Sequence, residues 1–374
     1  MMTLYPRGVY HVWLCNSTGR RLALVRDWTT LTYARSHPLS ALGQMSLKCG
    51  PRYDRIADIA SLLEVWRAPM PGMAMRHEGT FIVEKVEMAW GERTWAGDCV
   101  DKLLKFRIVD AVKDSPGANK SGPADNVAKA YVREGLSSLA ADPARDFNQW
   151  FPFRVQPDYA LAPSVSKDAA RAYVLDTLQA LAKSVAEDDV TPTWLSFEVA
   201  VTDHDTQFGV EFRTATRYRG LDRGLSSSSP LVLSEVNALA KVKRERDHSR
   251  EVTRVIVGGA GGRAQRYTTT VRDDRRQDKA PWWRREAFAD AGETTALAEL
   301  EAKGQSKLRE GRPIDRFTAT LRPHPSIAYG INLDYGDLVG VEAYGRYWTC
   351  RVEGVTVTAS PSDEKVDLRL EIVE

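Results

Sequence analysis

The sequence predicts an α+β protein that is mainly β. Three observations indicate this class. The first hundred residues consist of short strand-like runs separated by turn residues, the middle of the chain carries helical patterns, and the C-terminal part returns to strands. Short strands at this spacing are typical of a sandwich or a barrel. The sequence contains no internal repeat at a fixed short period.

The N-terminal strands are rich in Val, Trp, Tyr, Thr and Phe, which favour an extended backbone. The segment 80–90 differs from a half-exposed strand because both of its faces carry apolar side chains, with Ile82 on one face and Phe81 on the other. We expect another sheet or another subunit to cover both sides of it. The strands expected in this region cover residues 9–15, 21–27, 29–35, 45–49, 62–67, 80–90 and 93–99.

Helical patterns begin after residue 112. One candidate covers 124–140. A better candidate begins near Ser166 as its N-cap, carries an apolar stripe from Ala170 to Val185, and ends by about Ala186. A third helix is expected over 294–309, with Leu297, Leu300 and Leu308 facing inward. Strands at 193–201 and 208–215 and a linker at 225–230 lie between these helices.

The C-terminal residues read as strands again, over 316–322, 337–345, 346–359 and 364–374. In the last of these, Val366, Leu368, Leu370 and Ile372 alternate with charged residues, which predicts one buried and one exposed face. In the segment 329–341, Gly336 and Asp337 are expected to form a turn before the strand starts; a binding site on this loop is the alternative.

Composition is that of an ordinary globular chain, with 43% hydrophobic and 27% charged residues. No run is long enough for a membrane helix, and the N-terminus lacks the pattern of a secretion signal, so we expect folding in a cytoplasm. The net charge is only +2, although residues 241–286 carry a basic excess. A solvated face of mixed charge explains that excess best, and a surface for an acidic partner or DNA is the alternative.

The cysteines Cys15, Cys49, Cys99 and Cys350 are scattered, with no C-x-x-C pair. Four cysteines in a chain of this length do not form a disulfide framework. Three of them lie in strand-like runs, where a lone cysteine is usually a small buried apolar residue. We therefore expect structural thiols.

The glycine-rich segment RVIVGGAGGRAQRY, residues 254–267, satisfies G-x-G-x-x-G/A through Gly259, Gly261 and Ala264. A dinucleotide site requires such a turn to lead directly into a helix, whose N-terminal N–H groups hold the pyrophosphate. Here the turn leads to Thr268, Thr269, Thr270 and Val271, which favour a strand. The sequence therefore predicts a β-hairpin and no cofactor site.

No catalytic or metal-binding pattern is evident. The six histidines are far apart, and His77-Glu78 lacks the second histidine that a zincin helix needs. Asp203-His204-Asp205 has no partner cluster, and a solvated loop is the better interpretation. There is no nucleophile elbow. We therefore predict no catalytic, cofactor-binding or metal-binding residues, and no enzymatic activity.

The chain resembles the minor tail proteins that form the tail-tip, or baseplate, hub of siphophages infecting actinobacteria. The resemblance follows an ordered set of motifs along more than 300 residues. These motifs are RDWTTLTYAR (26–35), LLEVWR (62–67), TWAGDCVDKLLKFRIVD (94–110), ADNVAKAYVREGL (124–136), RVIVGGAGGRAQRY (254–267), APWWRREAFADAG (280–292), YGINLDYGDLVGV (329–341) and RVEGVTV (351–357).

The resemblance implies two small tail-tube-like β-barrel domains with α+β domains inserted between them. We expect an N-terminal barrel-like domain over 1–112, a helix-containing α+β domain over 113–200, a mixed region over 201–315 with the glycine-rich hairpin, and a C-terminal β domain over 316–374. The resemblance also implies a homotrimer in the virion tail tip, where two barrels in each of three chains imitate a six-membered ring. Its expected partners are a distal tail protein, the C-terminus of the tape-measure protein, receptor-binding or fibre proteins, and DNA in transit, with no stable membrane insertion.

Two other functions remain open from the sequence: a tail-associated carbohydrate- or receptor-binding protein, and a cell-wall-degrading tail enzyme. Open sheet edges tend to pair with another chain, and the strand 364–374 is a candidate edge, so its removal is expected to prevent a stable oligomer. The pair Trp282-Trp283 is a candidate interface anchor, with a core role for one of the two as the alternative.

Overall fold

A computed structural model describes residues 7–36, 42–57, 60–113, 115–184, 195–203, 209–215, 220–262, 265–292, 294–322, 324 and 326–373. The chain forms two compact units. The larger unit comprises residues 1–243 and 317–374, and the smaller unit comprises residues 244–316. The four-part division at 112/113, 200/201 and 315/316 that the sequence suggests stays a prediction.

The N-terminal hundred residues form seven strands, close to the positions that the sequence predicts. They follow one another in space as β3-β4-β7-β6-β5-β1-β2, with antiparallel pairing throughout. Their bounds are β1 Val9–Cys15, β2 Arg21–Val25, β3 Thr30–Ser36, β4 Gln44–Cys49, β5 Leu62–Ala68, β6 Arg76–Ala89 and β7 Glu92–Cys99.

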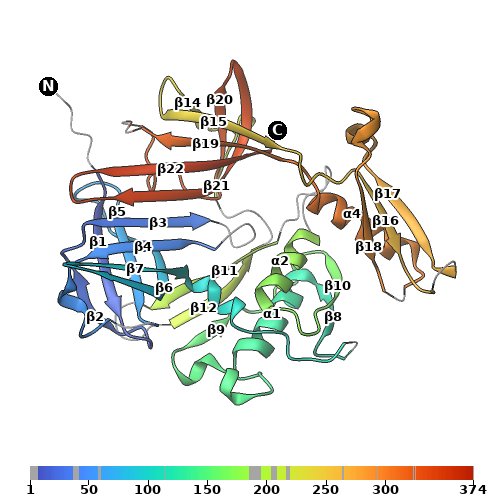
Figure 1. Cartoon of the computed structure of the whole chain (residues 1–374), viewed down its shortest axis with the longest axis horizontal. Helices are drawn as coiled ribbons and strands as arrows, with labels where there is room; N and C mark the ends of the chain where they lie inside the picture. Colours follow the sequence, from blue (N-terminus) through green and yellow to red (C-terminus); the bar gives the residue numbers. More distant parts are fainter. Residues whose placement is uncertain are drawn as a thin grey trace. The chain divides into compact units, whose positions relative to one another are not determined.

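The C-terminal strands continue the same sheet. Residues 354–359 of β21 pair antiparallel with residues 31–36 of β3, so that fourteen strands form one sheet (Figure 1). The order on the C-terminal side is β15-β19-β22-β21, and β20 pairs with the first half of β21. The bounds are β13 Asp222–Arg223, β14 Val232–Ser234, β15 Leu239–Asp247, β19 Ile314–Leu321, β20 Leu338–Ala343, β21 Arg346–Ala359 and β22 Glu364–Ile372.

A five-strand order occurs twice in this sheet. The N-terminal order β3-β4-β7-β6-β5 corresponds to β15-β19-β22-β21-β20, with the strands of each set in the same succession along the chain. β6 and β21 both have 14 residues. Each also carries one register shift against the next strand, between Val83 and Lys85 in β6 and between Val352 and Gly354 in β21. The strand order is therefore repeated within the fold, although the sequence shows no repeat at a fixed short period.

One hydrophobic core contains buried side chains from both halves of the sheet, including Leu31, Trp95, Val357 and Leu368. A second core lies against the other face of β5 and β6 and includes Leu62 and Ile82. The expectation that the strand at 80–90 is covered on both sides is confirmed for residues 80–83, which are all buried. From Glu84 onward this strand is largely exposed, because the second core ends there.

The second core is completed by α1 and α2, which lie beside two small sheets. α1 begins at Ala124, as predicted, but α2 begins at Val174 and not near Ser166. Ser166 lies instead in β10, paired with β8, and Arg171 has φ +58°, a turn conformation that a helix cannot contain. The bounds are β8 Asn119–Pro123, α1 Ala124–Leu136, β9 Phe153–Val155, β10 Ser164–Asp168, α2 Val174–Ser184, β11 Ser196–Asp203 and β12 Gly209–Ala215.

The smaller unit is a three-stranded sheet with a helix packed on it. Gly304 of α4 faces the sheet, and a Cβ there would lie 2.4 Å from Val271 Cγ2, so glycine permits the close approach. Leu300 and Leu308 are buried as predicted, whereas Leu297, in the first turn of the helix, is 59% exposed. The bounds are β16 Arg254–Gly258, β17 Thr268–Arg272, α3 Asp274–Gln277, β18 Glu286–Asp290 and α4 Leu297–Glu310.

The four cysteines are free, and only Cys99 is not fully buried. Among the described residues, none of the helices has the length and apolar character that a membrane span requires.

Candidate assembly site

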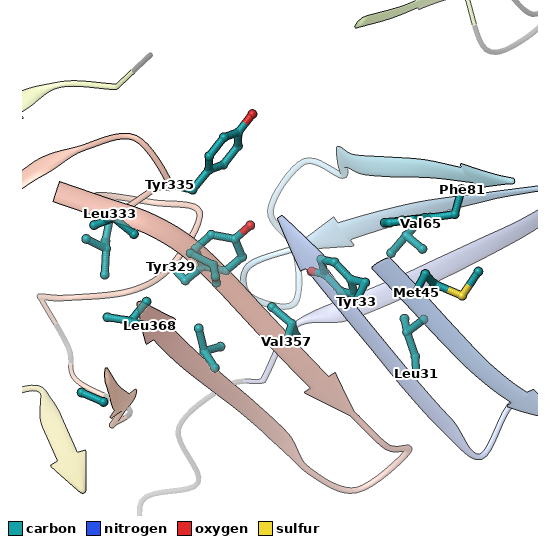
Figure 2. Close-up of a cluster of buried hydrophobic side chains, with 14 of the residues drawn as sticks. Leu31, Tyr33, Met45, Val65, Phe81, Tyr329, Leu333, Tyr335, Val357 and Leu368 are labelled. Atoms are coloured by element: carbon teal, nitrogen blue, oxygen red, sulfur yellow. The ribbon is translucent and has the colours of Figure 1, made fainter. Parts of the chain in front are cut away.

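The N- and C-terminal halves of the large sheet meet where β3 pairs with β21; we call residues 31–36 of β3 and 354–359 of β21 the joint. Val357 is paired with Tyr33, and both side chains are fully buried. Figure 2 shows Val357 between Leu31 and Tyr33 on one side and Tyr329 and Leu368 on the other. The joint is therefore the interior of one core and not a contact between two finished surfaces.

A group of buried and half-buried charged and aromatic side chains crosses the joint; we call it the polar clamp. Its members are Arg35, Arg67, Arg76, Glu78, Tyr329, Asp334 and Glu364. The arginines and Glu78 lie on β3, β5 and β6, whereas Tyr329, Asp334 and Glu364 come from the C-terminal half. These residues tie together parts of the chain that are more than 250 positions apart.

Glu78 is at the centre of the clamp and is only 3% exposed. Its carboxylate accepts hydrogen bonds from Arg76 Nε at 2.6 Å, from Tyr329 Oη at 2.6 Å and from Arg35 Nη1 at 3.3 Å. Asp334 accepts from Arg76 Nη2 at 3.2 Å and lies 3.5 Å from Arg35 Nη1. Two arginines are thus shared between two carboxylates from opposite halves.

Arg67 makes the second connection across the joint. Its guanidinium donates to Tyr10 Oη at 3.0 Å and to the Tyr329 carbonyl at 3.0 Å, and it forms an ion pair with Glu364. The chain bends round this guanidinium at Gly330, whose φ is +85° and where a Cβ would lie 3.1 Å from Arg67 Nη1. Glycine accommodates both the left-handed conformation and the close approach.

Electrostatics keep the clamp ionised. Burial alone would raise the pKa of Glu78, but the positive charges of Arg35 and Arg76 outweigh it and hold that pKa below its usual value. Burial raises the pKa of Tyr329, so its phenol stays protonated and donates to Glu78. Every charge of the clamp has an opposite charge beside it, so these ion pairs connect the two halves of the sheet.

Besides β2, which ends the strand order on the N-terminal side, β6 and β15 of the described sheet each have an open edge. Residues 76–82 of β6 pair with β5, but residues 85–89 have a strand partner only on the β7 side in the part of the chain that the structure describes. Met88 is 69% exposed there, and Trp90 at the hairpin turn is fully exposed. β15 is another such edge, since it ends the strand order and, among the described strands, pairs with β19 alone. Open edges with exposed apolar side chains mark interaction surfaces.

A hollow beside the clamp has a volume of about 940 Å³. Pro69, Met70, Pro71 and Ile327 form much of its apolar wall, and Arg67 and Glu364 reach its floor. No group of three or more metal-ligating side chains occurs among the described residues, there or elsewhere.

The glycine-rich segment forms a hairpin, as predicted. β16 pairs antiparallel with β17 from Arg254↔Arg272 to Gly258↔Thr268, and Gly259 N–H donates to the Tyr267 carbonyl at 2.8 Å. A Cβ at Gly259 would lie 2.2 Å from the Thr294 carbonyl oxygen. The glycines therefore serve close backbone packing. Of the motif positions, Ala264 lies outside the described residues, as do His204 and Asp205 of the candidate cation loop.

Half of the fourteen basic residues in the stretch 241–286 are arginines that pair with an acidic side chain. Arg276, for example, lies 2.7 Å from Asp273, and Arg266 lies 2.5 Å from Asp290. This pairing favours a solvated face of mixed charge over a surface for DNA. The arginines with an acidic partner within 4 Å are Arg244, Arg246, Arg254, Arg266, Arg272, Arg276 and Arg284.

The two adjacent tryptophans have different surroundings. Trp283 donates its indole N–H to Glu251 at 2.9 Å and lies under the Arg285 guanidinium, whereas Trp282 is 76% exposed. Only Trp282 is therefore available as an interface anchor.

The C-terminal strand is not an edge, contrary to the sequence-based expectation. β22 lies between β19 and β21, and its inward residues Val366, Leu368 and Leu370 are buried as the alternation predicts. Alternation reports which face is buried but not how many neighbours a strand has, which is why the edge prediction was wrong. The turn at Gly336 is present, with φ +92°, and the buried Asp337 carboxylate accepts from Leu221 N–H at 2.7 Å.

With this geometry established, the chain can be compared with known proteins. Residues 11–372 match the family described as Siphovirus ReqiPepy6 Gp37-like protein. The chain belongs to this family. The resemblance to a siphophage tail protein family is therefore confirmed, and the Gp37-like match covers both halves of the large sheet and the smaller unit. No curated protein matches the chain in sequence.

Solved structures similar to this Gp37-like chain include three phage tail proteins. The 43 kDa tail protein of prophage MuSo2 from Shewanella oneidensis aligns with a TM-score of 0.58 at 12% identity, over 96% of this chain and 98% of that one. The tail protein from Neisseria meningitidis MC58 aligns with a TM-score of 0.59 at 14% identity, over 98% and 96%. Prophage tail protein gp18 from Listeria monocytogenes EGD-e gives 0.51 at 10% identity, over 96% and 94%. The chain therefore has a mainly β phage tail protein fold.

Proposed function

We propose that this protein is a non-enzymatic structural hub of the siphophage tail tip, located in the virion and assembled as a homotrimer in the host cytoplasm. In this proposal each chain supplies two tube-like β-barrel halves, so that three chains form a pseudo-sixfold ring. The ring joins the tail tube and distal tail protein to the tape-measure protein and the fibres, and DNA passes through it.

The observation that carries the proposal is the repeated five-strand order within one sheet. A chain that contains the same strand arrangement twice presents two similar surfaces from one molecule. Three such chains present six, which lets a threefold assembly dock against a sixfold tube. The joint and the polar clamp support this role, because a hub must hold its two halves at a fixed angle.

The chemistry of the clamp also supports a structural role. Its ions are paired across the joint, and removing one partner of such a buried pair costs about 3–5 kcal/mol. An arrangement of this kind resists opening of the joint. Membership of a siphovirus family and the tail protein fold are consistent with a virion location.

The test is the assembly state of the purified full-length chain. Native mass spectrometry and negative-stain imaging are expected to show a trimer with six lobes round a central opening. A chain that remains monomeric at the highest soluble concentration, or a closed particle without an opening, would contradict the ring.

A further inference from the structure

We propose that residues 85–89 of β6 in one copy of the chain form an antiparallel ladder with the first part of β15, residues 239–243, in the next copy. This contact repeats the joint between copies, and it rests on the proposed ring because it names the surface through which the ring closes.

Positions in the last part of β6 can be matched to positions in the last part of β21. The register shifts align Lys85 of β6 with Gly354 of β21, because both residues directly follow the skipped position. Counting onward, Val86 corresponds to Val355 and Met88 to Val357. In the joint, Val355 and Val357 are the residues of β21 whose side chains enter the common core.

The matched positions differ in burial. Val357 is completely buried because β3 pairs with its strand, whereas Met88 is 69% exposed. Val86 already packs against the edge of the core. Met88 is a large apolar side chain on an open edge, whereas its counterpart Val357 is covered by a neighbouring strand. This difference indicates that another strand pairs with β6 at Met88 in the assembled protein.

The strand that fits this open edge is β15. In the repeated order, β15 holds the place of β3, which is the strand that covers β21. Leu239 is buried in the same core as Leu31 and Tyr33 of β3, and Val242 packs against it. Leu239 and Val242 are three positions apart because the strand is irregular at Lys241, whose φ is +55°. Lys241 and Lys243 point to the exposed face, and β6 carries the exposed Glu87 at the position of Thr356. Glu87 already pairs with Lys85 at 2.5 Å, so the match between the two edges lies in their apolar side chains and their places in the repeated order.

The β15 strand that pairs with residues 85–89 of β6 belongs to a second copy of the chain. Six strands separate β15 from β6 within the sheet of one chain. Each copy therefore offers one edge of each kind, at different places. A contact between unlike surfaces is heterologous, and it forms a closed ring when the rotation between neighbouring copies divides evenly into a full turn. The proposed trimer requires such a closed ring of three copies.

The first experiment compares two methionine variants of the full-length chain by native mass spectrometry and sedimentation. Met88→Glu places a charge at the centre of the new ladder and is expected to raise the concentration for half-assembly by at least about 100-fold. Met73→Glu, in the turn before β6 at an exposed position (44%), is the matched control and should assemble like the wild type. Equal assembly of both variants, with the wild type trimeric, would overturn the ladder and leave the ring standing.

The second experiment detects the contact between copies directly by cross-linking and does not require a variant that weakens assembly. The double variant Met88→Cys/Val242→Cys is treated with a short bis-maleimide and run on a denaturing gel, beside each single variant, in which only the free native cysteines accompany the new one. The ladder predicts covalent dimers and trimers in the double variant alone. A trimeric but uncross-linked double variant contradicts the ladder only, whereas a wild type that is never more than a monomer contradicts the ring and the ladder together.

Discussion

The last residues of β21 and the last residues of β6 occupy corresponding places in the two halves of the sheet, yet one stretch is enclosed and the other is open. β21 has β22 on one side and β20 followed by β3 on the other. β6 has β7 on one side and β5 only as far as Ile82 on the other. The sequence of a strand therefore sets its alternation of apolar and polar side chains, whereas the neighbouring strands decide whether the apolar side chains are buried.

The largest effect is expected from removing the strand on the enclosed side. A chain ending at residue 363 loses β22, which lies between β19 and β21 and contributes Val366, Leu368 and Leu370 to the core. We expect the larger unit not to fold, so that far-UV circular dichroism and hydrogen exchange show loss of protected β structure.

The control is a chain that lacks only residues 373 and 374, which should fold. If the chain ending at 363 gave a folded, soluble monomer, β22 would be a peripheral strand after all, and the contrast between the two halves would lose its basis.

A smaller effect is expected from breaking the polar clamp. Glu78→Ala leaves Arg35 and Arg76 without their shared buried carboxylate, and loss of one partner of a buried ion pair costs about 3–5 kcal/mol. Urea unfolding followed by tryptophan fluorescence measures the change in the free energy of unfolding.

Glu87→Ala, on the same strand but on the open side of the comparison, is the matched control. Its carboxylate pairs only with Lys85 at the surface, at 2.5 Å, and the variant should unfold like the wild type. Equal stability of the two variants would mean that the clamp does not hold the halves together.

Much of this architecture could be predicted from the sequence, because its signals are local. The period-two pattern in 364–374 and the Gly-rich turn between Ile256 and Thr270 each depend on a few adjacent residues. The helix at 166–186 was predicted to begin too early because Ser166 resembles an N-cap, whereas it lies in β10, whose pairing with β8 is a long-range fact. The repeated strand order left no trace in the sequence, since a strand position requires only an apolar side chain on one face and not a particular residue.

The polar clamp was missed for a related reason. Its residues are far apart in sequence, and each looks like an ordinary charged residue. One signal was present: Glu64 and Arg67 interrupt the apolar run LLEVWRA, and charged residues inside a buried strand are seldom found without partners. Both are in fact buried, with Arg21 beside Glu64 and Glu364 beside Arg67. The partners themselves could not be named without the fold.

Truncating the corresponding side chains Val357 of β21 and Met88 of β6 tests the contrast between the enclosed and the open strand. Val357→Ala removes two buried carbon atoms from the joint and should lower the free energy of unfolding by about 2 kcal/mol, including the cavity left behind. Met88→Ala should leave it unchanged when the chain is kept dilute and monomeric, because the side chain is exposed there. If Met88→Ala also destabilised the dilute monomer, β6 would have a partner strand within its own chain and the contrast would fail.

The smallest effect concerns pH and isolates the electrostatic part of the clamp. The pKa of Glu78 is lowered in the folded chain from its ordinary value of 4.5, because Arg35 and Arg76 outweigh the opposing effect of burial. A carboxyl group with a depressed folded-state pKa stabilises the folded chain fully above its unfolded pKa, and this contribution is lost as the pH falls through the folded value. Comparing the wild type with Glu78→Gln cancels the other carboxyl groups. The difference in urea midpoint should be constant from pH 7 to about pH 5 and should narrow below about pH 4.5. A difference that widened on acidification would show that Glu78 is protonated in the folded chain, and the clamp would then hold the two halves by hydrogen bonds without its central charge.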